Sequence, residues 1–244
     1  MMAQLAIAQG NLTEESKDAP YSEGHMGVVF DLVGSFPPLT IPEIKVDTVD
    51  LWRKWSLVEN YSFGKNRGSI PMINELGALH PYFRDKIIEL IQICRAKGIE
   101  LAVVETIRTR SKQNQYKGMG KKYTRSGGGS SKHQYGLAVD LVPVVDSIAV
   151  WDSSALWKKI GVAGEKLGLR WGGRWKKPYD PGHFEWTRGL GSNHFAAGAF
   201  PAIPDKENYP CLEEDINKLK AHWTAWEIEQ STLARKEVST SGMK

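Results

Sequence analysis

The sequence predicts a protein of the α+β class, in which a small sheet is flanked by helices. Two observations predict this class: two segments carry apolar residues at helical spacing, and two others are short apolar runs typical of buried strands. These segments fall within residues 69–190, which we predict to form one domain. Residues 1–68 and 191–244 are then extensions on either side of it.

The first predicted helix lies in "LHPYFRDKIIELIQICRAKGIE", where one face is apolar throughout. The residues on that face are Phe83, Ile87, Leu90, Ile91 and Cys94. Pro81 suits the first turn of a helix and Gly98 suits its C-terminal cap. A second one-faced helix is predicted in "SALWKKIGVAGEKLGL", with Trp157, Ile160, Ala163 and Leu167 on one side.

The two predicted strands are "IELAVVET", which ends at Glu105, and the run around "GLAVDLVP". Between them lies a polar, basic and glycine-rich stretch from Ile107 to Lys132. The segment "RWGGRWKKPYDPGHFEW" reads as a turn and a bend followed by a short strand.

A long helix is predicted in the C-terminal extension, in "LEEDINKLKAHWTAWEIEQSTLARK". Its apolar stripe consists of Ile216, Leu219, Trp223 and Trp226. We expect this stripe to dock on the domain, with self-association as the alternative. Residues 1–68 are interrupted by prolines and predict only a short helix at 49–61; we assign them no function.

Composition excludes several classes of protein. The chain has 244 residues, of which 41% are hydrophobic and 25% charged, as in ordinary globular proteins. Two cysteines are too few for a disulfide framework or a cysteine-ligated zinc finger. No apolar stretch approaches the roughly 20 residues that span a bilayer. The first charges of the chain are acidic and no basic residue precedes its first apolar patch, so a secretory signal is not expected.

One acid stands in the middle of an apolar strand. In "SSKHQYGLAVDLVP", Asp140 has aliphatic neighbours on both sides, and a buried carboxylate is costly unless something positive compensates it. A metal ion held by Asp140 and His133 is one explanation, and the small Gly136 and Ala138 between them leave room for an ion and a substrate. The alternative is an aspartate that pairs with an arginine or caps a turn.

The segment "YDPGHFEW" offers a third metal ligand. His183 would complete the three protein ligands of a catalytic zinc site, which leaves one coordination position open. Asp180 lies near enough in sequence to act as a general base on water. Glu185 is a competing base; in a strand it shares the face of His183 and could instead orient that ligand.

Several motifs in order resemble a known family. "SKHQYGLAVD" matches S-x-H-x-x-G-x-A-x-D and "DPGHFEW" matches [DE]-x-x-H, the signatures of zinc peptidases that cut peptidoglycan peptides. This group includes D-Ala-D-Ala carboxypeptidases of the VanY type and L-Ala-D-Glu endopeptidases of bacteria and phages, endolysins among them. The resemblance extends from about Ile70 to Trp186 and includes "INELGALHP", "ETIRTRSKQ" and "EKLGLRWGGRW".

The resemblance implies a Hedgehog/DD-peptidase-like zinc peptidase domain with a small antiparallel sheet. It implies Zn²⁺ as the cofactor, and the ligands that match are His133, Asp140 and His183. By the same matches Asp180 is the acid/base and Arg108 the arginine that contacts substrate and helps to stabilise the oxyanion. Gln113 and Ser131 are candidate substrate or supporting contacts. Arg174, in "WGGRW", departs from the Asp or Asn that the family often has there.

We therefore expect a zinc-dependent peptidase that cuts the stem peptide of peptidoglycan between L-Ala and D-Glu. Trimming of terminal D-Ala is the close alternative, and a non-catalytic cell-wall-binding protein is a remote one. The expected place of action is the bacterial cell wall, periplasmic or extracellular, by a delivery route that stays open. A monomer is favoured.

The basic residues between the two strands have two readings. They are Arg108, Arg110, Lys112, Lys117, Lys121, Lys122, Arg125 and Lys132, with no acid among them. They form either a groove that attracts an anionic polymer or a solvated loop. No nucleic-acid partner is expected, because the stretch lacks a recognition helix and aromatic interleaving.

Overall fold

The computed structural model describes residues 67–121, 123–124 and 126–241. The predicted extension of residues 1–68 therefore lies outside the described residues, except for its last two positions. In chain order the elements are η1 (Leu76–Ala78), α3 (Pro81–Arg95), β1 (Glu100–Glu105), α4 (Arg110–Gly118), η2 (Lys132–Tyr135), β2 (Ala138–Val145), β3 (Ile148–Ala149), α5 (Ser154–Lys166), β4 (Arg170–Trp171), η3 (Gly172–Arg174), β5 (His183–Glu185), α6 (Ser192–Ala196), η4 (Lys206–Asn208) and α7 (Leu212–Ser241).

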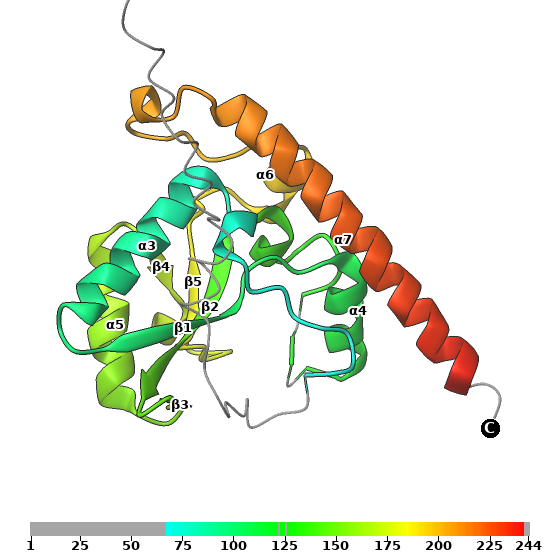
Figure 1. Cartoon of the computed structure of the whole chain (residues 1–244), viewed down its shortest axis with the longest axis horizontal. Coiled ribbons are helices and arrows are strands. Elements are labelled where there is room, and N and C mark those ends of the chain that lie inside the picture. The colour runs from blue at the N-terminus through cyan, green and yellow to red at the C-terminus, as the bar shows by residue number, and fades with distance from the viewer. Residues whose placement is uncertain (1–66, 122, 125, 242–244) are drawn as a thin grey trace, which may run out of the picture. The chain divides into compact units, whose positions relative to one another are not determined.

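The sheet is small and antiparallel, as expected for this α+β protein (Figure 1). Its strands lie in the order β1-β2-β5-β4, and the short β3 pairs with β2. In the β2–β5 ladder Val139 lies opposite Phe184, and Asp140 lies opposite His183. Because successive side chains on a strand alternate between faces, these two cross-strand pairs occupy opposite faces of the sheet.

Helices α3 and α5 pack side by side against one face of the sheet (Figure 1). The approach of α5 is close at two glycines. A methyl group on Gly164 would lie 2.6 Å from the Phe184 ring, and one on Gly161 would lie 2.2 Å from the Trp171 ring. Phe184 therefore faces the helices, and its neighbour His183 faces the opposite side.

The two one-faced helices and the two apolar strands form where the sequence predicts them. Pro81 begins α3, and all five predicted apolar positions of that helix are buried. Gly98 follows the helix with a φ of 71°, a left-handed conformation that glycine adopts without strain. Glu105 ends β1, and Asp140 lies within β2.

The basic stretch between β1 and β2 was expected to form either a groove for an anionic polymer or a solvated loop. It is not a loop throughout. Arg110–Gly118 form the helix α4, capped by the Thr109 side chain, which accepts a hydrogen bond from the Lys112 amide. Lys112 itself is buried, and its ammonium donates to the carbonyl oxygens of Arg67 and Ile70. Lys122 and Arg125 lie outside the described residues.

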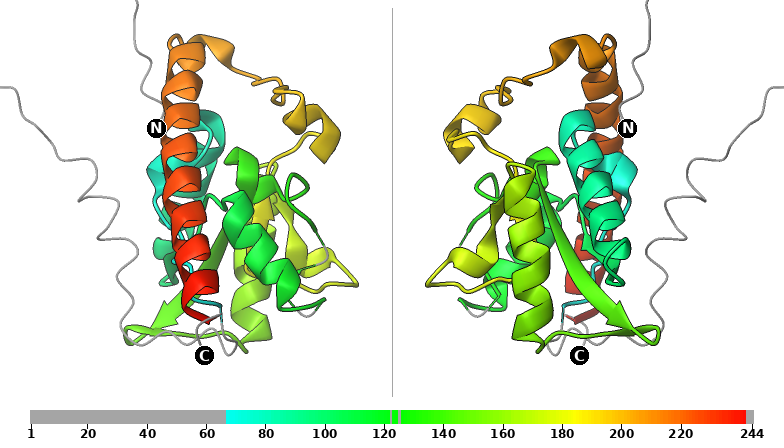
Figure 2. Two further views of the ribbon diagram at one scale, coloured as in Figure 1. Left: turned by 90° about the vertical axis from the view of Figure 1, so that its right-hand side faces the viewer. Right: turned by 90° about the vertical axis from the view of Figure 1, so that its left-hand side faces the viewer.

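The long C-terminal helix α7 docks on the domain through its predicted stripe, and contacts α3, α4 and η1 (Figure 2). Leu219 is buried, and the Trp223 indole donates to the Ala78 carbonyl oxygen over 2.9 Å. No helix among the described residues is both long enough and apolar enough to cross a membrane.

Gly136 does not leave room for an ion and a substrate as expected, because α7 docks beside it. A methyl group on Gly136 would lie 2.7 Å from the Trp223 ring and 2.9 Å from the Ala78 carbonyl oxygen. The space beside Gly136 is therefore filled by the C-terminal helix and does not serve an ion or a substrate. The segment "HQYGLAVD" alone could not predict this contact, because α7 lies far away in the sequence.

Candidate metal centre

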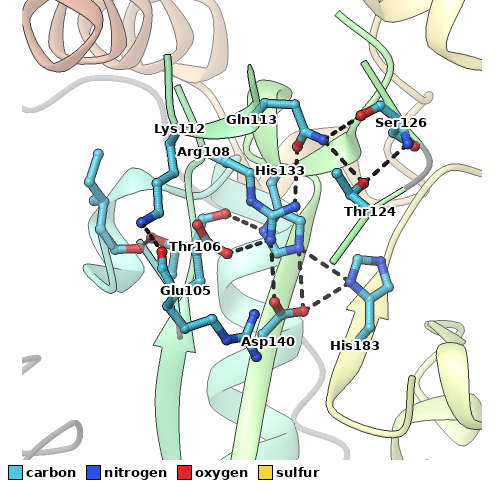
Figure 3. Close-up of polar contacts among 12 residues, drawn as sticks. Glu105, Thr106, Arg108, Lys112, Gln113, Thr124, Ser126, His133, Asp140 and His183 are labelled. Atoms are coloured by element: carbon cyan, nitrogen blue, oxygen red, sulfur yellow. Dashed lines mark hydrogen bonds and ion pairs between the residues drawn. The ribbon is translucent and has the colours of Figure 1, made fainter. Parts of the chain in front are cut away.

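Three side chains from three elements meet on the face of the sheet opposite α3 and α5 (Figure 3). His133 comes from η2, Asp140 from β2 and His183 from β5. One ligand atom of each lies within 4.8 Å of the others. Asp140 Oδ1 is 3.0 Å from His183 Nδ1 and 3.3 Å from His133 Nε2. The chain thus brings together the three residues that its motifs single out.

In each of the two imidazoles, one ring nitrogen contacts an oxygen outside the cluster of three ligands. The other nitrogen is thereby directed at the point between the three side chains. His133 Nδ1 lies 2.8 Å from the carbonyl oxygen of Thr106, which can only accept, so in the neutral ring Nδ1 carries the proton and Nε2 has the lone pair that a metal ion would need. His183 Nε2 lies 3.2 Å from Glu185 Oε2, which leaves Nδ1 facing inward. Two neutral imidazole nitrogens and a carboxylate, each supported from behind, are the donor set of a divalent metal such as zinc.

The electrostatics of these groups also favour a cation at the centre. Burial raises the pKa of Asp140, but the charge of His133 and hydrogen bonds from His133 and His183 outweigh it and hold that pKa well below its usual range. Burial lowers the pKa of His183, but hydrogen bonds to Asp140 and Glu185 outweigh it and raise the pKa. The pocket therefore keeps its carboxylate charged and draws positive charge to the point between the three side chains.

Arg108 also compensates Asp140, so the second explanation of the buried acid holds as well. Its guanidinium forms an ion pair with Glu105, and Nη2 lies 3.5 Å from Asp140 Oδ2. Burial lowers the pKa of Arg108, but the charge of Glu105 outweighs it and raises the pKa, so the guanidinium stays charged. Glu105 and Asp140 are paired residues on adjacent strands, and Arg108 bridges their carboxylates.

Glu105 is a site residue that the sequence reasoning missed. Its side chain is fully buried, and its Oε2 is the ion-pair partner of Arg108. The available signal was the one used for Asp140: an acid among apolar residues in a buried strand. That signal is weaker for Glu105, because it stands at the end of its strand, where an acid is ordinary.

Gln113 and Ser131 have different positions. Gln113 Oε1 accepts a hydrogen bond from Arg108 Nη1 over 3.2 Å, and its amide nitrogen donates to the Ser126 carbonyl oxygen over 2.7 Å. Gln113 is buried and supports Arg108 from behind. Ser131 lies at the beginning of η2, on the wall of the cavity described next.

A cavity of about 570 Å³ opens over the three candidate ligands. Asp180 lies on its wall, and burial together with the negative charge of Asp140 raises the pKa of Asp180. The cationic residues around the cavity are Arg67, Arg108, Lys132, Arg170, Lys176 and Lys177. They outnumber the acids there, which are Asp140, Asp180 and Glu185. The cavity therefore offers a carboxyl near the centre and a cationic rim for an anionic molecule.

Glu185 shares the face of His183, as the alternation along the strand predicts. Both of its oxygens are engaged: Oε2 with His183, and Oε1 with Arg170 Nη1 over 2.7 Å. This arrangement favours the role of orienting His183 over that of a base.

Arg174, the residue that departs from the family motif, lies away from the cavity. Its guanidinium pairs with Glu165 of α5 over 2.8 Å and 2.9 Å, on the surface. The neighbouring Trp175 lines the cavity instead, with its ring centroid 5.1 Å from that of His183.

Comparison with known proteins agrees with the geometry. A family model described as D-alanyl-D-alanine carboxypeptidase matches residues 124–186. The peptidoglycan L-alanyl-D-glutamate endopeptidase CwlK of Bacillus subtilis (strain 168) is 32% identical over 121 residues, which are 44% of this chain and 72% of CwlK. The L-alanyl-D-glutamate peptidase of Listeria phage A118 is 28% identical over 158 residues, 63% of this chain and 54% of the phage protein.

Among solved structures, the Serratia marcescens L-Ala D-Glu endopeptidase ChiX aligns with a TM-score of 0.39 and 27% identity, over 46% of this chain and 83% of ChiX. The match to CwlK, at this identity and over most of that protein, is the decisive one. The chain belongs to the family of zinc D-Ala-D-Ala carboxypeptidases and L-Ala-D-Glu endopeptidases that cut peptidoglycan peptides.

Proposed function

We propose that this protein is a zinc-dependent peptidoglycan peptidase that hydrolyses the stem peptide between L-Ala and D-Glu. The observation that carries the proposal is the convergence of His133, Asp140 and His183 on the wall of a cavity that is also lined by Asp180 and Arg108. CwlK and the Listeria phage A118 protein are both named for L-alanyl-D-glutamate cleavage, which favours this bond.

In this proposal His133, Asp140 and His183 would hold the zinc ion. When bound, zinc supplies Lewis-acid chemistry: it polarises the scissile carbonyl and makes water a stronger nucleophile at neutral pH. Glu185 and the Thr106 carbonyl oxygen keep the two imidazoles turned toward the centre.

Asp180 is the proposed acid/base. It takes the proton that the attacking water loses and later delivers it to the amine that leaves. Its position on the cavity wall supports this role, and its raised pKa suits a group that must both accept and donate a proton. Glu185 is less suited to the task, because both of its oxygens are already engaged.

Arg108 is proposed to hold the substrate carbonyl oxygen as negative charge develops on it, or a carboxylate of the peptide. Glu105 and Gln113 fix the guanidinium from behind. Ser131 is a proposed substrate contact from the cavity wall, whereas Gln113 acts through Arg108. The cationic rim suits a stem peptide, which carries several carboxylates.

Removal of terminal D-Ala is the second candidate, favoured by the description of the family model. Digestion of purified peptidoglycan sacculi, followed by mass spectrometry of the fragments, separates the two activities. Cleavage between L-Ala and D-Glu leaves fragments with a new D-Glu N-terminus, whereas carboxypeptidase activity releases free D-Ala.

If the Asp180→Ala variant digested sacculi as fast as the parent chain, the proposed mechanism would fail. Binding without digestion would support a cell-wall-binding protein.

We place the action of the protein at the bacterial cell wall, on its periplasmic or extracellular side. We further propose a monomer whose catalytic domain spans residues 69–190. The helix α7, although it belongs to the C-terminal extension, is docked on this domain.

A further inference from the structure

The N-terminus of α4 carries charges of the wrong sign for a helix. Its first turn contains Arg110 and Lys112 and no acid. The partial positive charge at a helix N-terminus favours negative groups, so two cations there are destabilising. Thr109 accepts one backbone N–H, which leaves other amides of the first turn without a partner from α4 itself.

Helix α7 supplies the missing negative charge. The Glu227 carboxylate accepts hydrogen bonds from the backbone amide of Arg110 over 2.6 Å and from that of Ser111 over 3.2 Å. It also accepts from the Ser111 hydroxyl over 3.3 Å. A carboxylate from a helix that is distant in sequence thus caps α4. Its negative charge offsets the positive charges of the two cations in the first turn.

A second residue of α7 holds the same segment. Gln230 is buried; its carbonyl oxygen accepts from the Thr109 hydroxyl, and its amide nitrogen donates to the Pro71 carbonyl oxygen over 2.8 Å. Because Thr109 is the N-cap of α4, its contact with Gln230 acts at the beginning of that helix, and the contact with Pro71 fixes the Gln230 side chain. Figure 2 shows α7 and α4 side by side.

The segment held in this way carries Arg108. Arg108 directly precedes the N-cap Thr109, and its backbone amide donates to the His133 carbonyl oxygen over 3.1 Å. Its guanidinium is also tied to α4, through the hydrogen bond from Nη1 to Gln113. A shift of the α4 N-terminus would therefore move the guanidinium relative to Asp140 and the cavity.

We infer that α7 is a working part of the active site and that Glu227 is a positioning residue for Arg108, acting through the cap of α4. The inference rests on the proposed role of Arg108 in substrate binding. It assigns a function to the C-terminal extension, whose described residues contribute no side chain to the metal centre itself.

The test compares Glu227→Ala with Glu229→Ala in the full chain. Glu229 is an exposed acid on the same helix, so it matches the change in charge and in helix propensity. We expect Glu227→Ala to lower kcat/KM on a stem peptide by roughly tenfold or more, since small misplacements of a binding group have large kinetic effects. Zinc content should not change, and Glu229→Ala should stay within about twofold of the parent chain. Glu227→Gln, which keeps one oxygen acceptor, should fall between them.

A double-mutant cycle separates positioning from general stability. In an Arg108→Ala background, Glu227→Ala should cost less than about twofold, because the group that it positions is gone. An equal loss with and without Arg108 would overturn the inference, as would equal kcat/KM for the two glutamate variants.

Hydrogen exchange supplies a readout that does not depend on activity. Amides of residues 107–116 should exchange faster in Glu227→Ala than in Glu229→Ala. Unchanged exchange there would refute the coupling of α7 to this segment. If the parent chain cut no stem peptide but the exchange difference were present, the proposed function would fail while the structural coupling would stand.

Discussion

Asp140 and His183 are direct partners across the β2–β5 ladder, and their side chains meet with Oδ1 3.0 Å from Nδ1. The site depends on this register. A slip of one residue would place Phe184 opposite Asp140 and turn His183 toward α3 and α5. The packing of Phe184 against α5 therefore fixes the geometry of the metal centre from the other face of the sheet.

Replacement of Asp180 tests the proposed acid/base. Asp180→Ala should lower kcat by roughly 10²- to 10⁴-fold, the usual contribution of general acid–base catalysis. Its zinc content should equal that of the parent chain, because Asp180 is not one of the three clustered ligands. Asp152→Ala, at an exposed position outside the cavity, is the matched control. Steady-state hydrolysis of a stem peptide measures kcat, and retention of full activity would exclude Asp180 from the reaction.

Replacement of Glu185 separates its two candidate roles. If Glu185 orients His183, Glu185→Gln should weaken zinc affinity by roughly 10- to 100-fold, as expected when a hydrogen-bond partner of a ligand is lost. Competition with a chromophoric chelator measures this affinity. Glu165→Gln, which disrupts a surface pair with Arg174, should leave it unchanged. A fall in kcat at unchanged zinc affinity would instead make Glu185 the base.

His80 should make the protein less stable in mild acid. It is buried against the rings of Trp186 and Phe200, and burial together with the charge of Arg84 lowers the pKa of His80 from 6.5 to about 4. Between about pH 4 and pH 6.5, His80 is therefore protonated in the unfolded chain but neutral in the folded chain. Stability is complete above this window and is lost as the pH falls through it.

Between pH 7.5 and pH 5 the loss from His80 should be about 2 kcal/mol. Urea denaturation at the two pH values measures it. His80→Leu removes the titrating group and should show a correspondingly smaller loss than the parent chain. Equal losses in both proteins would show that His80 is not the source.

Gly136 should tolerate no side chain. Its φ of 62° costs an alanine roughly 1–2 kcal/mol, and overlap of the new methyl group with Trp223 and Ala78 should add about 1–3 kcal/mol. Gly168→Ala is the control, because Gly168 has a similar φ of 79° but open space around it. Gly136→Ala should therefore unfold at lower urea concentration than Gly168→Ala. Equal midpoints would mean that α7 does not pack tightly at this position.

The parts of the fold that follow from local pattern were predictable. The five apolar positions of α3 and the aliphatic run of β2 report burial directly, because these segments face the core. Helix α4 was not predictable from "RSKQNQYKG", which is polar almost throughout. Its helical state depends on groups far away in the sequence, among them the Glu227 cap and the backbone carbonyl oxygens that bind Lys112.

The same limit applies to the site. The motifs identify the three candidate ligands because all three lie at fixed spacings within two short segments of the sequence. Local reading could not show that Glu105 engages Arg108, nor that Gly136 makes room for Trp223. These contacts join elements whose proximity only the folded chain creates.

The zinc content of the purified chain tests the central claim most directly. After equilibration with zinc and dialysis, elemental analysis should find about one zinc ion per chain, the stoichiometry of a single three-ligand site. In Asp140→Asn, which keeps the shape of the side chain but removes its charge, it should find far less, while Asp146→Asn at an exposed turn should match the parent chain. Stoichiometric zinc in Asp140→Asn, or none in the parent chain, would contradict the site described above.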